Sequence, residues 1–278
     1  MTSFAPRVAY TASVLRTVVV AAACVVLHMS DARAQEPAVE PQAATSEVLV
    51  FEQMRVPRTL AETVVRAAHA TGIDPAYMMA LADKESSLVP NNKARTSSAE
   101  GLFQFIESTW LDVIRRYGAR HGYAEQAEAI EVVQGRPTVS DPAQRRAILE
   151  LRRDPYASAL MAGEMINTHR QMLAGKVARD PSFAELYMAH FLGVNGASRF
   201  VALLSDTPGK SARQAFPAAA RANRKLFSAA KGSGRRSGKA LSVAELHGRI
   251  DTMIDKRVTR YASVRDDLLP AVVATLAP

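Results

Sequence analysis

Cysteine is almost absent from this sequence of 278 residues, with Cys24 as the single example. One cysteine excludes an internal disulfide framework and any metal site built from several thiolates. The six histidines form neither an HExxH motif nor a pair spaced i, i+4, the patterns typical of zinc sites. We therefore predict no metal and no other cofactor.

Long hydrophobic runs are missing beyond the N-terminal region. Residues 17–29 form an apolar run with Arg7 and Arg16 before it and an A-x-A site ending at Ala34 after it. This pattern is typical of a secretory signal peptide cleaved after Ala34, and the run is too short to span a bilayer comfortably. We therefore expect a periplasmic protein. An uncleaved N-terminal anchor and lipidation at Cys24 are the alternatives, and the apolar run continuing past Cys24 disfavours lipidation.

Acidic residues are in the minority, and the formal net charge is +8, of which +6 remains on the mature chain. A basic exported protein attracts an anionic partner, and export argues against nucleic acid. Residues 210–239 hold nine Lys or Arg and no acid. This stretch is typical of a solvated basic loop, and the alternative is that it holds an anionic polymer.

Alternating strand patterns are also missing, and helical spacing runs through most of the mature sequence. Asp-Pro pairs precede four helical patterns, since Asp caps a helix and Pro suits its first position; they lie at Asp74, Asp141, Asp154 and Asp180. Thr59 and Ser242 each begin a capping box. We therefore predict an all-α fold.

Composition places the domain boundaries. We expect a signal peptide over 1–34, a flexible linker over 35–56, a helical domain over 57–205, and a basic loop with a helical extension over 206–278.

Several large residues of the helical domain are expected to lie in its core. The helix beginning after Asp154 should be central and buried, with Met161 and Met165 in the core. Trp110 either packs in the core, which its helical spacing favours, or stacks on a sugar ring.

The helix that starts at Pro75 carries the candidate acid, Glu85, in its last turn. Met78, Leu81 and Glu85 follow the spacing of one apolar stripe. Apolar neighbours and the negative end of the helix dipole both favour a protonated carboxyl. A protonated carboxyl is what a general acid needs to cleave a glycosidic bond. The alternative is that Glu85 marks the helix end and simply reaches water.

The residues that follow carry a resemblance to a family. Glu85-Ser86, an Asn-rich loop, the stretch SSAEGLFQ over 97–104 and Ser108-Thr109-Trp110 resemble the lytic transglycosylases of the soluble (SLT) type. The resemblance covers roughly 60–205 and implies a lysozyme-like α fold with a glycan-binding cleft. It also implies a lyase that cleaves the β-1,4 bond between N-acetylmuramic acid and N-acetylglucosamine in peptidoglycan. Glu85 would be general acid and then base, and the product a 1,6-anhydro sugar.

The same resemblance implies substrate-binding roles in the loop for Ser97, Ser98, Gly101 and Gln104. The spacing from Glu85 to Gln104 is one residue longer than in many relatives, so Thr96, Ser97 or Ser98 could carry the serine role. Gly101 either lets the backbone pass close to a sugar or meets the needs of a turn.

A later family motif, Ala-Tyr-Asn-Ala-Gly, is altered here. The matching stretch is Ala189 to Gly193, with His190 in place of the tyrosine and Phe191 in place of the asparagine. Either the His190 imidazole replaces the missing hydroxyl, or Tyr187 supplies it from one helical turn earlier. A structural role for His190 is the third alternative.

Two other functions stay open. The first is a hydrolytic glycosidase of the lysozyme or chitinase type, which ordinarily needs a second carboxyl group. Glu100, Glu107 and Asp112 are the candidates for that group. The second is a non-catalytic cell-wall-binding scaffold of a secretion or flagellar system, and such an apparatus is also a conceivable partner of an active enzyme.

Overall fold

The computed structural model describes residues 47–229 and 239–276. The predicted signal peptide, Cys24, the linker as far as residue 46 and the basic stretch over 230–238 lie outside the described residues. Within the described ranges, no helix combines the length and the apolar character needed to cross a bilayer.

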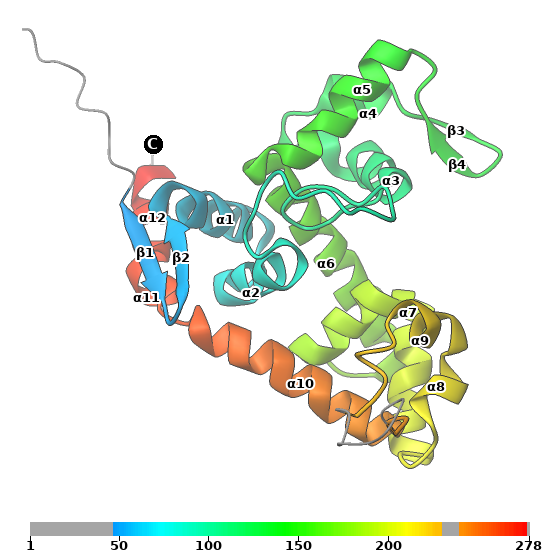
Figure 1. The fold of residues 1–278 in the computed structure, drawn as a ribbon. Helices are drawn as coiled ribbons and strands as arrows, with labels where there is room; N and C mark the ends of the chain where they lie inside the picture. Colours follow the sequence, from blue (N-terminus) through cyan, green and yellow to red (C-terminus); the bar gives the residue numbers. More distant parts are fainter. Residues whose placement is uncertain (1–46, 230–238, 277–278) are drawn as a thin grey trace, which may run out of the picture. The chain divides into compact units, whose positions relative to one another are not determined.

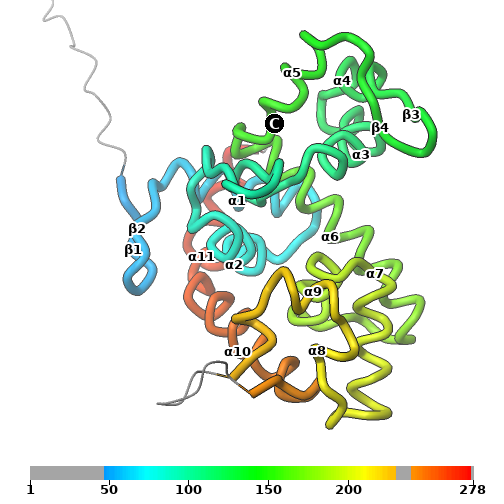
Figure 2. The backbone as a smooth tube through the Cα atoms, turned by 45° about the vertical axis from the view of Figure 1, so that its right-hand side comes forward, coloured from blue at the N-terminus to red at the C-terminus, as the bar shows by residue number. Residues whose placement is uncertain are grey.

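The described chain is mostly helical, which confirms the predicted fold class (Figures 1 and 2). Its longer helices are α1 (Arg58–Thr71), α2 (Pro75–Ser86), α3 (Glu107–Tyr117), α6 (Pro155–Val177), α7 (Phe183–Asp206) and α10 (Val243–Arg260). The shorter ones are α4 (Ala124–Glu128), α5 (Pro142–Glu150), α8 (Ala212–Ala215), α9 (Pro217–Ala222), α11 (Val264–Asp267) and α12 (Leu269–Leu276). Two 3-10 turns, η1 (Gly118–His121) and η2 (Leu151–Arg153), join neighbouring helices.

Two small antiparallel hairpins accompany the helices. Strands β1 (Val48–Phe51) and β2 (Met54–Pro57) form the first, and β3 (Glu131–Val133) and β4 (Arg136–Thr138) the second. The prediction of a flexible linker over 35–56 is therefore wrong for residues 48–56, which belong to the first hairpin. Phe51 and Val56 are buried in the core, and this burial fixes the hairpin against the helices.

Helix starts follow the predicted caps in most cases. Asp74, Asp141 and Asp154 each accept hydrogen bonds from first-turn backbone N–H groups, and a proline follows each. The start predicted at Asp180 is wrong by two residues, because Ser182 and Glu185 form a capping box that begins α7 at Phe183. The box predicted at Thr59 is also wrong, since α1 begins at Arg58 without a side-chain cap.

Helix α6 is central, as predicted, and packs against α1, α3 and α7. Met161 and Met165 are buried in the core. A Cβ on Gly163 would lie 2.2 Å from the Thr71 hydroxyl, so glycine lets α1 and α6 approach closely. Trp110 is fully buried and its Nε1 donates to the Ile148 carbonyl at 2.7 Å, which confirms the core interpretation.

The C-terminal extension packs on the same core as the helical domain. Helix α7 ends at Asp206, next to the boundary predicted at residue 205, and changes direction at Gly193, whose φ of 72° and ψ of 162° are not helical. Helix α10 is capped by Ser242 as predicted and contacts both α2 and α7. Its buried residues are Val243, Leu246, Ile250, Ile254 and Val258.

Candidate active site

The C-terminal end of α2 places Glu85. The chain leaves the helix at Ser87 and Leu88, which both have left-handed φ values of 55° and 60°. Their N–H groups donate back to the carbonyls of Asp83 at 2.9 Å and Ala82 at 3.4 Å, a closure typical of helix C-termini. Glu85 therefore lies in the last helical turn, where the sequence placed it.

The Glu85 side chain is 17% exposed, and its Oε1 lies 3.9 Å from His190 Nε2 on α7. This separation is too long for a hydrogen bond but close enough for one charge to act on the other group. The end of α2 and the first half of α7 thus bring Glu85 and His190 together. The carboxyl does not extend freely into water, which disfavours the interpretation that Glu85 only marks the helix end.

Tyr187, one turn before His190, is buried at 3% exposure. Its ring stacks on Phe191, and the Lys84 ammonium lies 5.6 Å from the ring centroid. Burial raises the pKa of Tyr187, and the negative charge of Glu85 raises it further. The hydroxyl is therefore neutral over the physiological pH range, and the ring is mainly a packing element.

His190 is more exposed than Tyr187, with 23% of its side chain accessible. Burial lowers the pKa of His190; the charge of Glu85 opposes this effect and that of Lys84 adds to it. At neutral pH the imidazole next to Glu85 is consequently uncharged. Of the two candidates for the altered motif position, His190 is the one that a ligand can reach.

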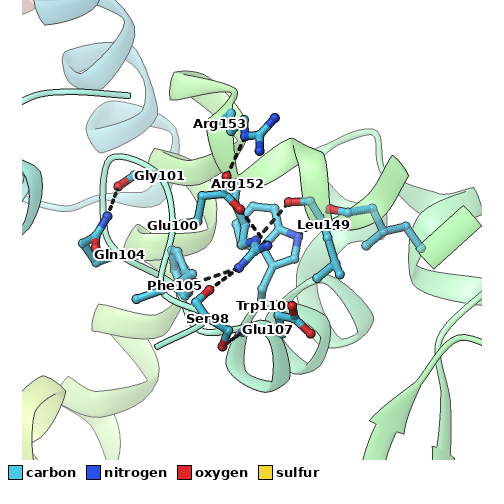
Figure 3. A network of polar contacts seen from close by, with 12 residues as sticks. Ser98, Glu100, Gly101, Gln104, Phe105, Glu107, Trp110, Leu149, Arg152 and Arg153 are labelled. Atoms are coloured by element: carbon cyan, nitrogen blue, oxygen red, sulfur yellow. Dashed lines mark hydrogen bonds and ion pairs between the residues drawn. The ribbon is translucent and has the colours of Figure 1, made fainter. Parts of the chain in front are cut away.

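A buried arginine shapes the loop between α2 and α3 (Figure 3). Arg152 is 4% exposed and donates to the carbonyls of Leu149, Ser98 and Phe105 and to the Glu100 carboxylate at 2.9 Å. Arg153 donates to the second Glu100 oxygen at 2.6 Å. The loop is therefore closed by a residue 52 positions after Glu100, and no local sequence signal identified it.

Residues 62–130 match the family model of the transglycosylase SLT domain. The chain contains an SLT domain of the lysozyme-like superfamily. The matched segment covers most of α1, all of α2 with Glu85, the Arg152-held loop, α3 and α4. Tyr187 and His190 on α7, and the whole of α10, lie beyond it.

Other carboxylates of the SLT domain are engaged by arginines. Glu100 is 4% exposed and binds Arg152 and Arg153. Glu107 pairs with Arg145, and Asp112 pairs with Arg115 and Arg116 on its own helix. Among the described residues, by contrast, no Lys or Arg nitrogen lies within 4.0 Å of Glu85. These contacts argue against Glu100, Glu107 and Asp112 as a second catalytic carboxyl.

The loop residues that the sequence predicted to bind substrate take part in the loop's own hydrogen bonds. Gln104 Nε2 donates to the carbonyls of Asn92 at 2.9 Å and Gly101 at 2.8 Å. The hydroxyls of Ser97 and Ser98 accept from the N–H groups of Ala99 and Glu107, both at 3.3 Å, and both serines are exposed.

Close packing, which could not be predicted from the sequence, explains why position 101 is a glycine. Its φ is 88°, and a Cβ there would lie 1.9 Å from the Arg152 carbonyl oxygen. The close neighbour is therefore protein backbone. Within the described residues, no hydrogen bond or ion pair joins this loop directly to Glu85 or His190.

A surface pocket lies between α7 and the segment that contains α8 and α9. It is lined in part by Phe191, Leu192, Arg199 and Phe216. Its lining includes neither Glu85 nor the loop of the SLT domain, so this pocket is not the predicted glycan cleft.

Proposed function

We propose that this chain is an exported lytic transglycosylase. It cleaves the β-1,4 bond between N-acetylmuramic acid and N-acetylglucosamine in peptidoglycan and forms 1,6-anhydro-N-acetylmuramic acid. The observation that carries the proposal is the setting of Glu85 in the SLT domain. Its carboxyl is largely buried at a helix end and faces a neutral His190, while Glu100, Glu107 and Asp112 are held in ion pairs.

A single carboxyl suffices for this reaction. Protonated Glu85 gives its proton to the glycosidic oxygen as the bond to the anomeric carbon breaks, and the substrate's N-acetyl group stabilises the positive carbon. The Glu85 carboxylate then takes the proton from the C6 hydroxyl, whose oxygen forms the new bond to the anomeric carbon. Glu85 ends protonated as it began, and no water is consumed.

The neutral state of His190 supports the first step. A positive charge 3.9 Å away would favour the ionised carboxylate and so oppose proton donation. Because burial disfavours the imidazolium, Glu85 meets an uncharged neighbour at neutral pH. We propose that His190 lines the glycan site, while buried Tyr187 supports it from behind.

The loop of the SLT domain supplies the remaining proposed contacts. Ser97 and Ser98 are exposed and can offer hydroxyls to the substrate's N-acetyl groups. Gln104 and Gly101 act by fixing the loop backbone, through the Asn92 carbonyl and the Arg152 carbonyl respectively.

Digestion of purified sacculi tests the proposal. The wild type should release muropeptides with anhydro ends, detected by mass. Glu85→Gln should reduce their release by about 10²- to 10⁴-fold, the usual contribution of general acid catalysis. Glu128→Gln is a matched control, because Glu128 is exposed on α4 within the same SLT domain. Its activity should equal that of the wild type.

The other outcomes separate the alternatives. Products with hydrated reducing ends would identify a hydrolase. Binding of sacculi without release of any product would identify a wall-binding scaffold. Full activity of Glu85→Gln would show that the acid is another residue.

A further inference from the structure

The helix that carries Glu85 is held by arginines from the C-terminal extension. Asp83, two residues before Glu85, is 7% exposed and accepts a hydrogen bond from Arg260 Nη1 at 2.8 Å. Arg257 Nε lies 3.5 Å from the same Asp83 oxygen. Both arginines belong to the last turn of α10, far from α2 in sequence and outside the segment matched to the SLT domain.

Arg260 also reaches a third segment. Its Nε donates to Glu52 at 2.8 Å, in the turn between β1 and β2. The two carboxylates raise the pKa of Arg260. Since the side chain is 13% exposed, solvent screens these contacts less than it would on an open surface. The last turn of α2, the end of α10 and the first hairpin therefore meet at one guanidinium.

The contact acts on the side of α2 away from the acid. Residues two positions apart in a helix point about 200° apart, given 3.6 residues per turn. Asp83 thus faces α10 while Glu85 points elsewhere, toward His190 of α7. Helix α10 packs on α7 as well as on α2 (Figure 1), so the same helix supports both elements that bring Glu85 and His190 together.

We propose that Arg260, through Asp83, is a positioning residue that sets the place of Glu85 relative to His190. This inference rests on the proposed role of Glu85 and extends the catalytic unit to the C-terminal extension. Removal of the guanidinium frees the last turn of α2 and the acid moves. A displacement of about 1 Å at a reacting group costs up to about 100-fold in rate.

The test compares two arginine–aspartate contacts at opposite ends of α2. Arg265 on α11 binds Asp74, the N-cap of α2, through two hydrogen bonds at 2.8 and 2.9 Å. Asp74 is eleven residues before Glu85, or about 16 Å along the helix. Arg265→Met therefore removes a similar contact at a site remote from the acid.

We expect Arg260→Met to lower turnover on saturating sacculi by about tenfold to 100-fold with unchanged binding of sacculi in sedimentation. Arg265→Met should lower the melting temperature comparably and leave turnover within about twofold of the wild type. Arg260→Lys keeps a cation beside Asp83 and should recover part of the lost turnover. All rates are measured well below each variant's melting temperature, on protein shown to be folded by circular dichroism.

Equal turnover of Arg260→Met and Arg265→Met would overturn the positioning role, as would a loss confined to sacculus binding. If Arg260→Met does not fold, Arg260→Lys and Asp83→Asn take its place in the test. Wild-type turnover in both of these folded variants would overturn the positioning role.

A wild type that releases no muropeptides would overturn the proposed function itself. This result differs from one in which the wild type is active and the Arg260 variants are as active, so the two failures can be told apart.

Discussion

Two histidines, His169 and His190, both have lowered pKa values. Burial lowers the pKa of His169 on α6 from 6.5 to about 4, and the charge of His190 adds to the effect. The pKa of His190 is also lowered, but the carboxylate of Glu85 opposes the change. The two imidazoles therefore belong to a partly desolvated region in which added positive charge is unfavourable.

The lowered pKa of His169 predicts how the free energy of unfolding depends on pH. The unfolded chain binds a proton at position 169 below about pH 6.5, whereas the folded protein does so only near pH 4. The free energy of unfolding should therefore fall as the pH drops through this window, by about 3 kcal/mol from this residue. Above pH 6.5 its contribution is constant.

Urea unfolding of the wild type and His169→Gln at pH 7, 5.5 and 4 measures this contribution. The difference in stability between the two proteins should change by that amount across the series. His69→Gln, at an exposed position on α1, is the control substitution. Parallel profiles for the wild type and His169→Gln would contradict the prediction.

At the scale of single elements, the loop of the SLT domain depends on a glycine whose role can be isolated. Gly101 and Gly135 both have positive φ, at 88° and 75°. A Cβ on Gly101 would clash with the Arg152 carbonyl oxygen at 1.9 Å, while a Cβ on Gly135, in the β3–β4 turn, would meet open space. A substitution at either position would therefore strain the backbone, but only at Gly101 would the new side chain also clash with a neighbour.

Gly135→Ala should cost about 1–2 kcal/mol, the price of a left-handed non-glycine residue. Gly101→Ala should cost clearly more, because backbone must shift and the buried Arg152–Glu100 pair with it. Denaturant unfolding measures the loss of stability in each variant. Digestion of sacculi measures whether the change at Gly101 in the loop also lowers activity. Equal destabilisation by the two substitutions would show that the loop can adapt, and that the close approach of Gly101 to the Arg152 carbonyl does not affect stability.

Local signals account for the elements that the sequence predicted correctly. Asp74-Pro75 and the Ser242 capping box act within one helical turn, so reading neighbouring residues is enough. The first hairpin could not be predicted, because Phe51 and Val56 are buried in a core formed by residues distant in sequence. The roles of Arg152 and Arg260 could not be predicted for the same reason, since their partners are 52 and 177 residues away. The position of Glu85 at the end of its helix could be predicted. The contacts that Arg152 makes to the loop and Arg260 makes to Asp83 could not.

At the scale of the whole molecule, the SLT domain and the C-terminal extension share one core. Leu246, Ile250, Ile254 and Val258 on α10 are buried. Burying one such side chain contributes about 1.5–3 kcal/mol, and folded proteins are stable by about 5–15 kcal/mol in total. The loss of the whole stripe would therefore remove a large fraction of the stability.

We accordingly expect a chain truncated after Thr207 to lose its cooperative thermal transition and its activity on sacculi together. A graded version replaces one side chain: Ile250→Ala, at a fully buried position, should cost about 2–5 kcal/mol. Lys256→Ala, exposed on the same helix, should be close to neutral. A truncated chain that unfolds cooperatively near the wild-type melting temperature would show that the SLT domain folds independently. In that case the contacts of α10 with α2 and α7 would serve only to position the site, and the turnover of the truncated chain would measure that contribution directly.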